Sequence, residues 1–326
     1  MSTHPTDVEP STVSALIEEA KRNPLRWIVP DIVLENGIHV LHGAEESFKT
    51  MLTLQMHEAL TQGGQFLLRS VKGGVRTGIA ELEMKARPFG NRLARFFPGD
   101  APDIRVLPET LRRKVLSGRT PKDRIKVIVD WAESQGLDVI SIDSAVKLFP
   151  PGCDLNKPDM ASEVFNQLQQ LPTVSIIGHD RKPMPGLETR GNAEIVGSGR
   201  FAQDPDVVHQ MVREDRRAPV VEFSWGKMRD GEKFDPLLLF FDRVNYRLYP
   251  LHPYVHLLSQ RPMLRTELVA EAERRYGWKE RRASDYLTSL ARLVDASGNP
   301  CVTETMEGHA KQFTLNAQPT ALLESP

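Results

Sequence analysis

The sequence has only two cysteines, Cys153 and Cys301, among its 326 residues. So few thiols argue against a disulfide scaffold or a cysteine-rich metal site, and they fit a reducing cytosol. Long apolar runs are also missing, because none approaches the roughly 20 residues of a membrane-spanning helix. The first twenty residues are polar and lack the shape of a signal peptide. We therefore expect a cytoplasmic protein with no membrane partner.

An excess of charge of either sign is absent too, because 42 Lys and Arg residues nearly balance 43 Asp and Glu residues. A formal net charge of −1 gives no global basic surface for nucleic acid, so any such surface has to be local. Hydrophobic residues make up 40% of the chain and charged residues 26%, as in ordinary globular proteins. The length suffices for one large α/β domain with a small appendage.

One short segment combines an apolar strand, a tight loop and the start of a helix. Residues 37–41 lead into Gly43, and Lys49 and Thr50 open the helix. The spacing G-x-x-x-x-x-K-T is that of a phosphate-binding loop, whose backbone N–H groups and lysine hold phosphates and whose hydroxyl binds Mg²⁺. An ordinary strand-loop-helix ending in Lys-Thr is the alternative. The residues predicted to bind ATP are Gly43, Ala44, Glu45, Glu46, Ser47, Phe48, Lys49, Thr50 and Met51.

Phe48 departs from this pattern, which has glycine directly before the lysine. Because the helix begins at this point, we expect Phe48 to have an ordinary helical φ, which a residue with a side chain tolerates. On this interpretation the loop still binds phosphate with phenylalanine in the place of glycine.

A second apolar strand, at residues 137–142, ends in the carboxylate of Asp143. In P-loop NTPases such a strand carries an Asp to the C-terminal edge of a parallel sheet, where it holds Mg²⁺ through water. A core strand that merely ends in Asp is common, but two such strands in this order are much less so. Together they predict a P-loop NTPase in which Thr50 and Asp143 hold the metal.

Strand-like and helix-like segments alternate over most of the chain, which predicts an α/β fold with a mostly parallel central sheet and helices on both faces. The predicted strands are 38–41, 77–82, 104–107, 139–142, 174–177, 207–212, 220–225 and 237–242. The predicted helices are 13–21, 49–61, 88–97, 122–135, 160–168 and 193–201. The last two strands flank a polar turn and are expected to form a hairpin.

The same pattern divides the chain into five parts. They are an N-terminal polar segment with a short helix (1–25), an ATPase domain (26–250), a linker (251–262), a small winged-helix-like domain (263–318) and a tail (319–326). The winged-helix pattern consists of helices at 264–276 and 280–293 and two short strands near 301–303 and 312–315. Basic residues at the second helix suit DNA phosphates, but glutamates lie among them and winged helices also dock proteins.

At this point the residues resemble a family. Over roughly residues 27–245, the chain looks like the RecA-like AAA-family ATPases of the RepA replicative helicase type, found in plasmids, phages and mobile elements and related to the DnaB helicases. Trp27–Pro30 is similar to the family's lead-in to its first strand, and Ser47–Thr50 resembles a loop variant of phage-type ATPases. The segment 143–156 resembles a loop that faces the ring channel in hexameric relatives.

The resemblance also implies catalytic roles beside that of Lys49. The segment 80–84 resembles the family's S-L-E-M segment, so Glu83 would orient the attacking water, with Glu81 as the second choice. His179 resembles the end of an H-H-x-x-K strand and would contact the γ-phosphate. The alternatives are a solvated acid at a helix start for Glu83 and a hydrogen-bonded edge residue for His179.

Lys227 and Arg229 resemble a K-x-R-x-G hairpin end that reaches the nucleotide of a neighbouring subunit. A planar arginine cation suits the charge that develops on a transferring phosphoryl group. A solvated hairpin with two cations is the alternative. The resemblance therefore implies a homo-oligomer, a hexameric ring in some relatives, that binds ATP, Mg²⁺ and either single-stranded DNA or DNA-bound replication proteins.

Two functions remain open on the sequence alone. The first is an ATP-hydrolysing DNA helicase, or a DNA-dependent motor or loader, in the replication of a plasmid, phage or mobile element. The second is a nucleotide-switched DNA-binding regulator or adaptor with slow ATP turnover and no unwinding. The sequence lacks the strip of aromatic and basic residues that marks many single-strand binders.

Overall fold

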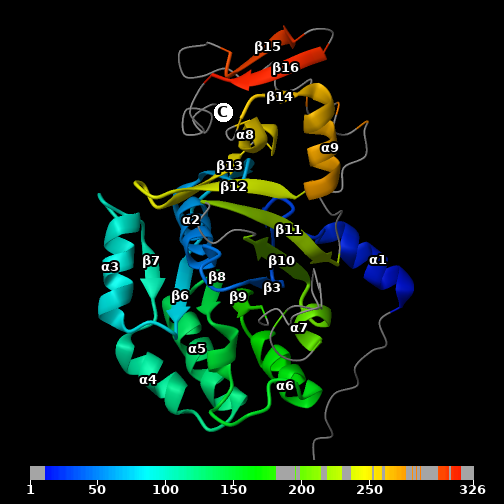
Figure 1. The fold of residues 1–326 in the computed structure, drawn as a ribbon. Helices are drawn as coiled ribbons and strands as arrows, with labels where there is room; N and C mark the ends of the chain where they lie inside the picture. The colour runs from blue at the N-terminus through cyan, green and yellow to red at the C-terminus, as the bar shows by residue number, and fades with distance from the viewer. Residues whose placement is uncertain are drawn as a thin grey trace, which may run out of the picture.

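A computed structural model describes residues 12–180, 195, 199–213, 219–229, 236–251, 253–258, 261–276, 281, 284, 287, 300–307 and 310–316. A nine-stranded sheet runs through its centre (Figure 1). The strand order is β13 (Arg247–Leu251), β12 (Leu237–Asp242), β11 (Val220–Met228), β10 (Val207–Val212), β3 (Ile38–Gly43), β9 (Thr173–His179), β8 (Val139–Asp143), β6 (Thr77–Glu81) and β7 (Ile104–Val106).

The strands from β10 to β7 run parallel to one another. Strands β11, β12 and β13 extend the sheet with antiparallel pairs, and β11 and β12 form the expected hairpin. The mostly parallel sheet is thereby confirmed, with every predicted strand present and only its ends shifted. Strand β13 is an addition that the sequence pattern did not predict.

Helices cover both faces of the sheet. Helices α2 (Lys49–Gln62) and α3 (Ala86–Phe96) pack into one apolar cluster. The opposite cluster takes apolar residues from α4 (Glu109–Ser117), α5 (Pro121–Gln135), the short 3₁₀ helix η1 (Ala145–Leu148), α6 (Pro158–Leu168) and α7 (Arg200–Gln203). Of the predicted helices, only 193–201 lies mainly outside the described residues, and α4 was not predicted.

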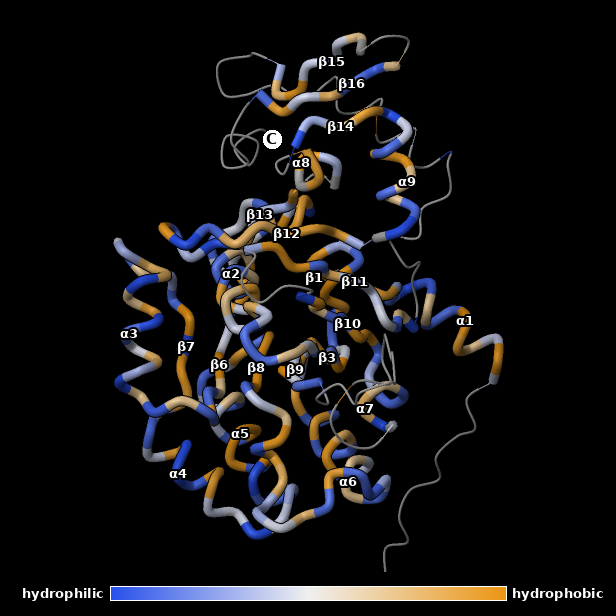
Figure 2. Tube along the Cα trace, viewed as in Figure 1, coloured by the Kyte–Doolittle hydropathy of each residue, from blue (hydrophilic) through white to orange (hydrophobic). Residues whose placement is uncertain are grey.

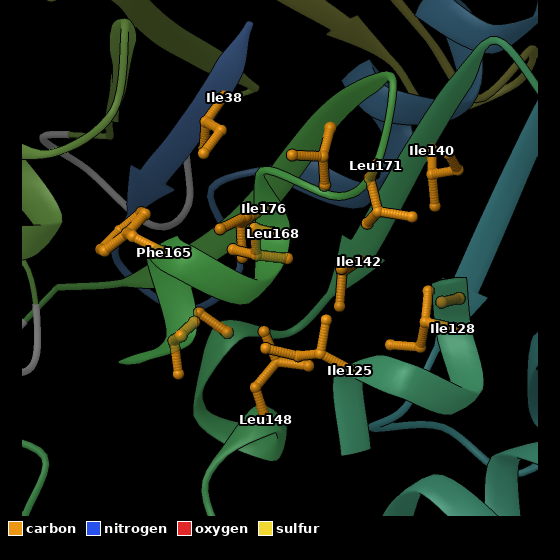
Figure 3. Packing of buried hydrophobic residues seen from close by; sticks show 14 of the residues in the cluster. Ile38, Ile125, Ile128, Ile140, Ile142, Leu148, Phe165, Leu168, Leu171 and Ile176 are labelled. Atoms are coloured by element: carbon orange, nitrogen blue, oxygen red, sulfur yellow. The ribbon is translucent and has the colours of Figure 1, made fainter. Parts of the chain in front are cut away.

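Successive residues of the central strands enter opposite clusters. Val40 packs on the side of α5 and α6, whereas Leu41 packs on the side of α2, and Ile140 and Val139 divide in the same way. This explains why the strands are apolar throughout, since a parallel sheet covered on both faces leaves no side for polar residues. Figure 3 shows the cluster beneath α5 and α6, and Figure 2 shows the apolar character of the central strands.

Helix α5 illustrates how local sequence signals set the ends of an element. The Thr120 hydroxyl accepts a hydrogen bond from the Asp123 amide, and the Asp123 carboxylate accepts one from the Thr120 amide. This reciprocal cap, with Pro121 in the first turn, fixes the start of the helix. Gly136 ends the helix in the left-handed conformation, at φ 58°.

The N-terminal part is built from α1 (Val13–Arg22), which the sequence predicted, and two small hairpins, which it did not. The hairpins are β1 (Trp27–Val29) with β2 (Val33–Leu34) and β4 (Gly64–Phe66) with β5 (Arg69–Val71). No helix in the described part of the chain is long and apolar enough to cross a lipid bilayer.

The C-terminal part contains a three-stranded sheet in the order β14 (Met263–Leu264), β16 (Ala310–Leu315) and β15 (Val302–Glu307), with helices α8 (Pro253–Leu258) and α9 (Arg265–Tyr276). Its apolar cluster includes Leu238 and Leu251 of the large sheet, against which it rests (Figure 1). Helix α8 lies within the range predicted as a linker, and its Tyr254 is fully buried in this cluster. The predicted helix 280–293 falls largely outside the described residues, so the winged-helix pattern and the domain boundaries stay predictions.

Two glycines test how tightly the core packs. A Cβ at Gly78, on β6, would lie 2.4 Å from Leu137 Cδ1 and 2.8 Å from a ring carbon of Trp131, whereas a Cβ at Gly90, in α3, meets nothing within 4 Å. We expect Gly78→Ala to lower the free energy of unfolding by about 1–3 kcal/mol, because over-packing displaces neighbours. Gly90→Ala should raise it by about 0.5–1 kcal/mol, because alanine favours the helix. Urea denaturation measures both, and equal stabilities would contradict this packing.

Candidate nucleotide-binding site

A cleft of about 690 Å³ opens where the parallel strands β3, β8 and β9 end. Gly43 pairs with His179 across β3 and β9, and Asp143 pairs with Ile177 across β8 and β9. The C-terminal edge of a parallel sheet is where α/β proteins bind ligands. The residues that line the cleft are Glu45, Glu46, Ser47, Phe48, Lys49, Thr50, Met51, Glu83, Arg92, Asp143, Val146, Lys147, Ile177, His179, Arg213, Phe241 and Tyr246.

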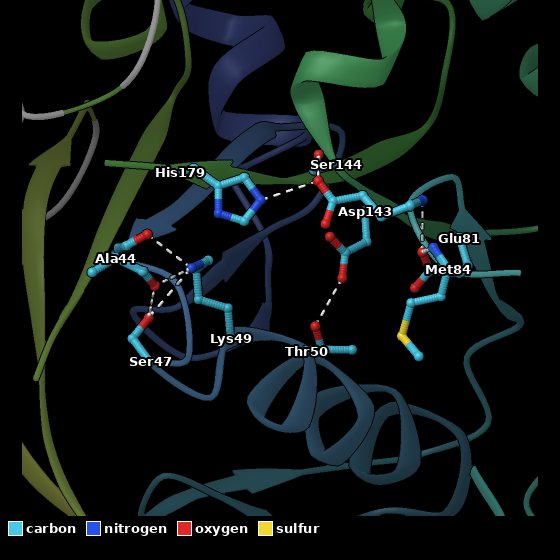
Figure 4. Close-up of polar contacts among 11 residues, drawn as sticks. Ala44, Ser47, Lys49, Thr50, Glu81, Met84, Asp143, Ser144 and His179 are labelled. Carbon is cyan, nitrogen blue, oxygen red and sulfur yellow. Dashed lines mark hydrogen bonds and ion pairs between the residues drawn. The ribbon is translucent and has the colours of Figure 1, made fainter. Parts of the chain in front are cut away.

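The loop between β3 and α2 folds around the Lys49 side chain (Figure 4). The Lys49 ammonium donates to Gly43 O at 2.8 Å and to Ala44 O at 2.7 Å, and it lies 3.3 Å from Ser47 Oγ. Burial lowers the pKa of Lys49, and nearby carboxylates oppose that shift. A Cβ at Gly43 would lie 2.4 Å from Met211 O, so only glycine fits there. The loop thus presents a buried cation to the cleft, as phosphate binding requires.

Phe48 corrects one expectation, because its backbone is left-handed, with φ 66° and ψ 16°, and not helical. The chain turns sharply before α2 begins at Lys49, and this turn needs the conformation that glycine usually supplies. The Phe48 ring stacks on Phe241 with centroids 4.2 Å apart, and the Arg213 guanidinium carbon lies 4.5 Å from its centroid. Such contacts contribute about 1 kcal/mol each, enough to offset a left-handed residue.

Thr50 and Asp143 meet as predicted for a Mg²⁺ site. The Thr50 hydroxyl donates to Asp143 Oδ2 at 2.8 Å, and Asp143 is buried at the end of β8 (Figure 4). Burial raises the pKa of Asp143. A hydroxyl and a carboxylate are oxygen donors that suit Mg²⁺, which takes its other ligands from phosphates and water. Within the described residues no group of three or more His, Cys, Asp or Glu could hold a metal by itself.

Glu81 and Glu83 follow one strand but have opposite electrostatic environments. Glu83 lines the cleft, lies 3.1 Å from His179 Nε2 and accepts a hydrogen bond from Ser144 Oγ. These contacts, that with His179 first, hold the pKa of Glu83 at about 2, so its carboxylate is charged at neutral pH. Glu81 is buried and accepts from the amides of Glu83 and Met84. Burial, aided by Asp143, raises the pKa of Glu81 to about 7.

Glu83 is therefore the better placed of the two carboxylates to orient water in the cleft. Ser144, which donates to it, was not predicted as a site residue, although it directly follows Asp143 in the sequence. The adjacency itself is the signal that could have found it, since a residue next to a strand-end Asp shares the same edge of the sheet.

Lys227 and Arg229 do not join the cleft of their own chain. Because β11 is antiparallel to β10, Met228 pairs with Val207 at the far edge of the sheet from Gly43. The Lys227 ammonium donates to the carbonyls of Gln203 and Pro205, and Arg229 pairs with Asp206 at 2.9 Å.

The far end of the cleft is aromatic, which the sequence did not predict. Phe241, at the end of β12, stacks on Phe48, and Tyr246 packs edge-on against Phe241 with centroids 5.8 Å apart. Flat apolar rings beside Arg92 and Arg213 suit a nucleobase. Phe241 and Tyr246 look like ordinary hairpin residues in the sequence, and no spacing relates them to the phosphate-binding loop.

A family described as AAA domain matches residues 3–184, which is more than half of the chain. The protein therefore belongs to this family of AAA domains. No curated protein matches the chain.

Solved structures show the same fold at low sequence identity. A DnaB-like replicative helicase, solved with its primase interactions, shares 13% identity at a TM-score of 0.52, over 74% of this chain and 68% of that one. A protein solved as an ATPase domain shares 13% at 0.52, over 72% and 95%. The KaiC-like protein PH0186 from Pyrococcus horikoshii OT3 shares 14% at 0.50, over 70% and 100%. The chain thus has a RecA-like ATPase fold, as its sequence predicted.

The pKa of Glu81 leads to a prediction about stability. A carboxyl with a pKa of about 7 in the folded protein, against its usual 4.5, contributes stability below pH 4.5 that is lost as the pH rises through 7. We expect Glu81→Gln, which keeps an acceptor for both amides, to gain stability over the unmodified protein across this window, by up to about 3 kcal/mol at pH 8. Urea denaturation from pH 4 to 8 measures the gain.

Glu83→Gln is the control for this prediction. Because the pKa of Glu83 is depressed to about 2, its contribution is present above pH 4.5 and lost only as the pH falls toward 2. This variant should therefore show no change in relative stability between pH 5 and pH 8. A pH-independent difference between Glu81→Gln and the unmodified protein would contradict the environment described for Glu81.

Proposed function

We propose that the protein hydrolyses Mg-ATP and is a DNA helicase, or a DNA-dependent motor or loader, in the replication of a plasmid, phage or mobile element. The observation that carries the proposal is the meeting of Lys49, Thr50, Asp143 and Glu83 at one cleft. A buried cation, a metal-binding pair and a charged carboxylate are the parts that phosphoryl transfer to water requires. Membership of the AAA domain family supports the same interpretation.

Each residue has a distinct part in the proposed hydrolysis. Lys49 neutralises charge on the β- and γ-phosphates, and bound Mg²⁺ would supply further positive charge there, held by Thr50 and Asp143. Glu83 accepts a hydrogen bond from the attacking water and orients it. His179, whose ring contacts Glu83, is placed to respond to the γ-phosphate.

A route from the cleft to a DNA-binding loop supports the motor hypothesis. The segment after Asp143 forms η1, whose residues Val146 and Lys147 line the cleft. The buried Arg124 guanidinium donates to the carbonyls of Lys147 and Phe149 at 2.7 and 2.9 Å. This segment is therefore attached firmly to α5 and leads directly into residues 150–157, which we propose contact single-stranded DNA.

A nucleotide-switched DNA-binding regulator or adaptor is the second candidate. It is favoured by the position of Lys227 and Arg229, which leaves the cleft of a single chain without either cation. A chain that acts alone would then turn ATP over slowly and respond mainly to nucleotide binding.

The two candidates differ in their response to DNA. We expect single-stranded DNA to raise the ATP hydrolysis rate of the full-length protein, because loops that grip DNA couple its binding to turnover. Glu83→Gln should keep ATP affinity but lose about 100-fold or more in rate, since it removes the charge that orients water. Lys49→Ala should lose Mg-ATP binding. A steady-state assay of phosphate release, with and without an oligonucleotide, measures these effects.

The outcomes separate three conclusions. An unchanged rate in a folded Lys49→Ala protein would rule out the phosphate-binding loop. Normal hydrolysis by Glu83→Gln, with loss in Glu81→Gln, would move the water-orienting role by two residues. A low rate that DNA does not change would favour the regulator.

Arg229 leads to a prediction about assembly. We propose a homo-oligomer in which Lys227 and Arg229 of one chain reach the nucleotide of the next. Arg229→Ala should then bind Mg-ATP almost normally yet hydrolyse it poorly. Mixing it with Lys49→Ala should restore activity, because some interfaces pair an intact loop with an intact arginine. A protein that stays monomeric at full activity with ATP and DNA would exclude this shared site.

A further inference from the structure

A buried imidazole–carboxylate pair lies next to the cleft without lining it. His42, directly before Gly43, is fully buried, and its Nδ1 lies 2.6 Å from Asp180 Oδ1. Asp180 directly follows His179, and its side chain is only 10% exposed. The pair therefore joins the end of β3 to the end of β9 immediately behind the phosphate-binding loop.

Asp180 and Lys49 converge on one backbone oxygen. The Asp180 amide donates to Gly43 O at 3.2 Å, and the Lys49 ammonium donates to the same oxygen at 2.8 Å. Among the carboxylates that raise the pKa of Lys49 against the effect of burial, Asp180 acts most strongly, ahead of Asp143. A buried negative charge thus stands close to the cation that the loop presents to the cleft.

Such a carboxylate is a competitor for ATP. In a low-dielectric environment an ammonium and a nearby carboxylate attract each other strongly, and leaving either without a partner is costly. An ion pair between Lys49 and Asp180 would occupy the cation that phosphates need. Instead, Lys49 is held by neutral oxygens of the loop, and Asp180 Oδ1 is held by His42.

We propose that His42 is a positioning residue that holds the Asp180 carboxylate away from Lys49 and so keeps the ammonium available to the phosphates of ATP. The inference rests on the proposed function, because it takes Mg-ATP as the ligand of the cleft. It assigns to a residue outside the phosphate-binding loop the control of the loop's affinity.

The test compares Mg-ATP binding and turnover of full-length variants. His42→Ala should weaken Mg-ATP binding and raise KM about tenfold, the effect of about one charged contact, with kcat changed much less. His42→Asn, whose amide can still donate to Asp180, should bind nearly as tightly as the unmodified protein. Adding Asp180→Asn to His42→Ala should restore affinity, because the competing charge is gone. Isothermal titration calorimetry and steady-state kinetics measure both quantities.

His39→Ala is the matched control, because His39 is a buried histidine on the same strand, far from the loop. It should lower the melting temperature without changing KM. Asp180→Asn alone, which leaves His42 in place, should bind Mg-ATP at least as tightly as the unmodified protein, and this arm holds even where His42→Ala fails to fold.

Three results would overturn the inference. They are an unchanged KM in folded His42→Ala, a raised KM that persists in the double variant, and loss of binding in Asp180→Asn. If the unmodified protein binds no Mg-ATP, the proposed function fails together with the inference. Normal binding by both the unmodified protein and His42→Ala leaves the proposed function standing and removes only the role of His42.

Discussion

The parallel pairing of β3 with β9, of β9 with β8 and of β8 with β6 is the constraint on which the site depends. In this register Gly43 lies beside His179, and Glu81 lies beside Asp143. Residues far apart in the chain thereby reach a single edge. The register is fixed because each strand sends alternate apolar residues into two different clusters, and a slip by one residue would exchange those sides.

Burial at this edge sets the charge of each functional group separately. It raises the pKa of Asp143 and of Glu81, and it lowers that of Lys49. Glu83 differs from Glu81 because its hydrogen bonds to His179 and Ser144 outweigh its partial burial. One strand end therefore carries a charged carboxylate toward the cleft and a second carboxyl that is easily protonated behind it.

The position of Lys227 and Arg229 gives the fold an asymmetry. The cleft occupies one edge of the sheet, while these two cations lie at the other, fixed by carbonyls and by Asp206. A sheet that offers a nucleotide cleft at one edge and a cationic hairpin end at the other has the geometry in which neighbouring copies can complete each other's sites. The antiparallel extension from β11 to β13 is what separates the two.

Sequence by itself determined the parts of this protein that depend on local pattern. The phosphate-binding loop, the strand that ends in Asp143 and the alternation of strands and helices are all visible in residue order, because spacing and apolar periodicity report local geometry. Only the tertiary structure decided the rest. The left-handed Phe48 depends on a ring partner, Phe241, that is distant in the chain, and the contact of Ser144 and His179 with Glu83 depends on strand register. The His42–Asp180 pair exists only because β3 and β9 are neighbours, a pairing that no local spacing encodes.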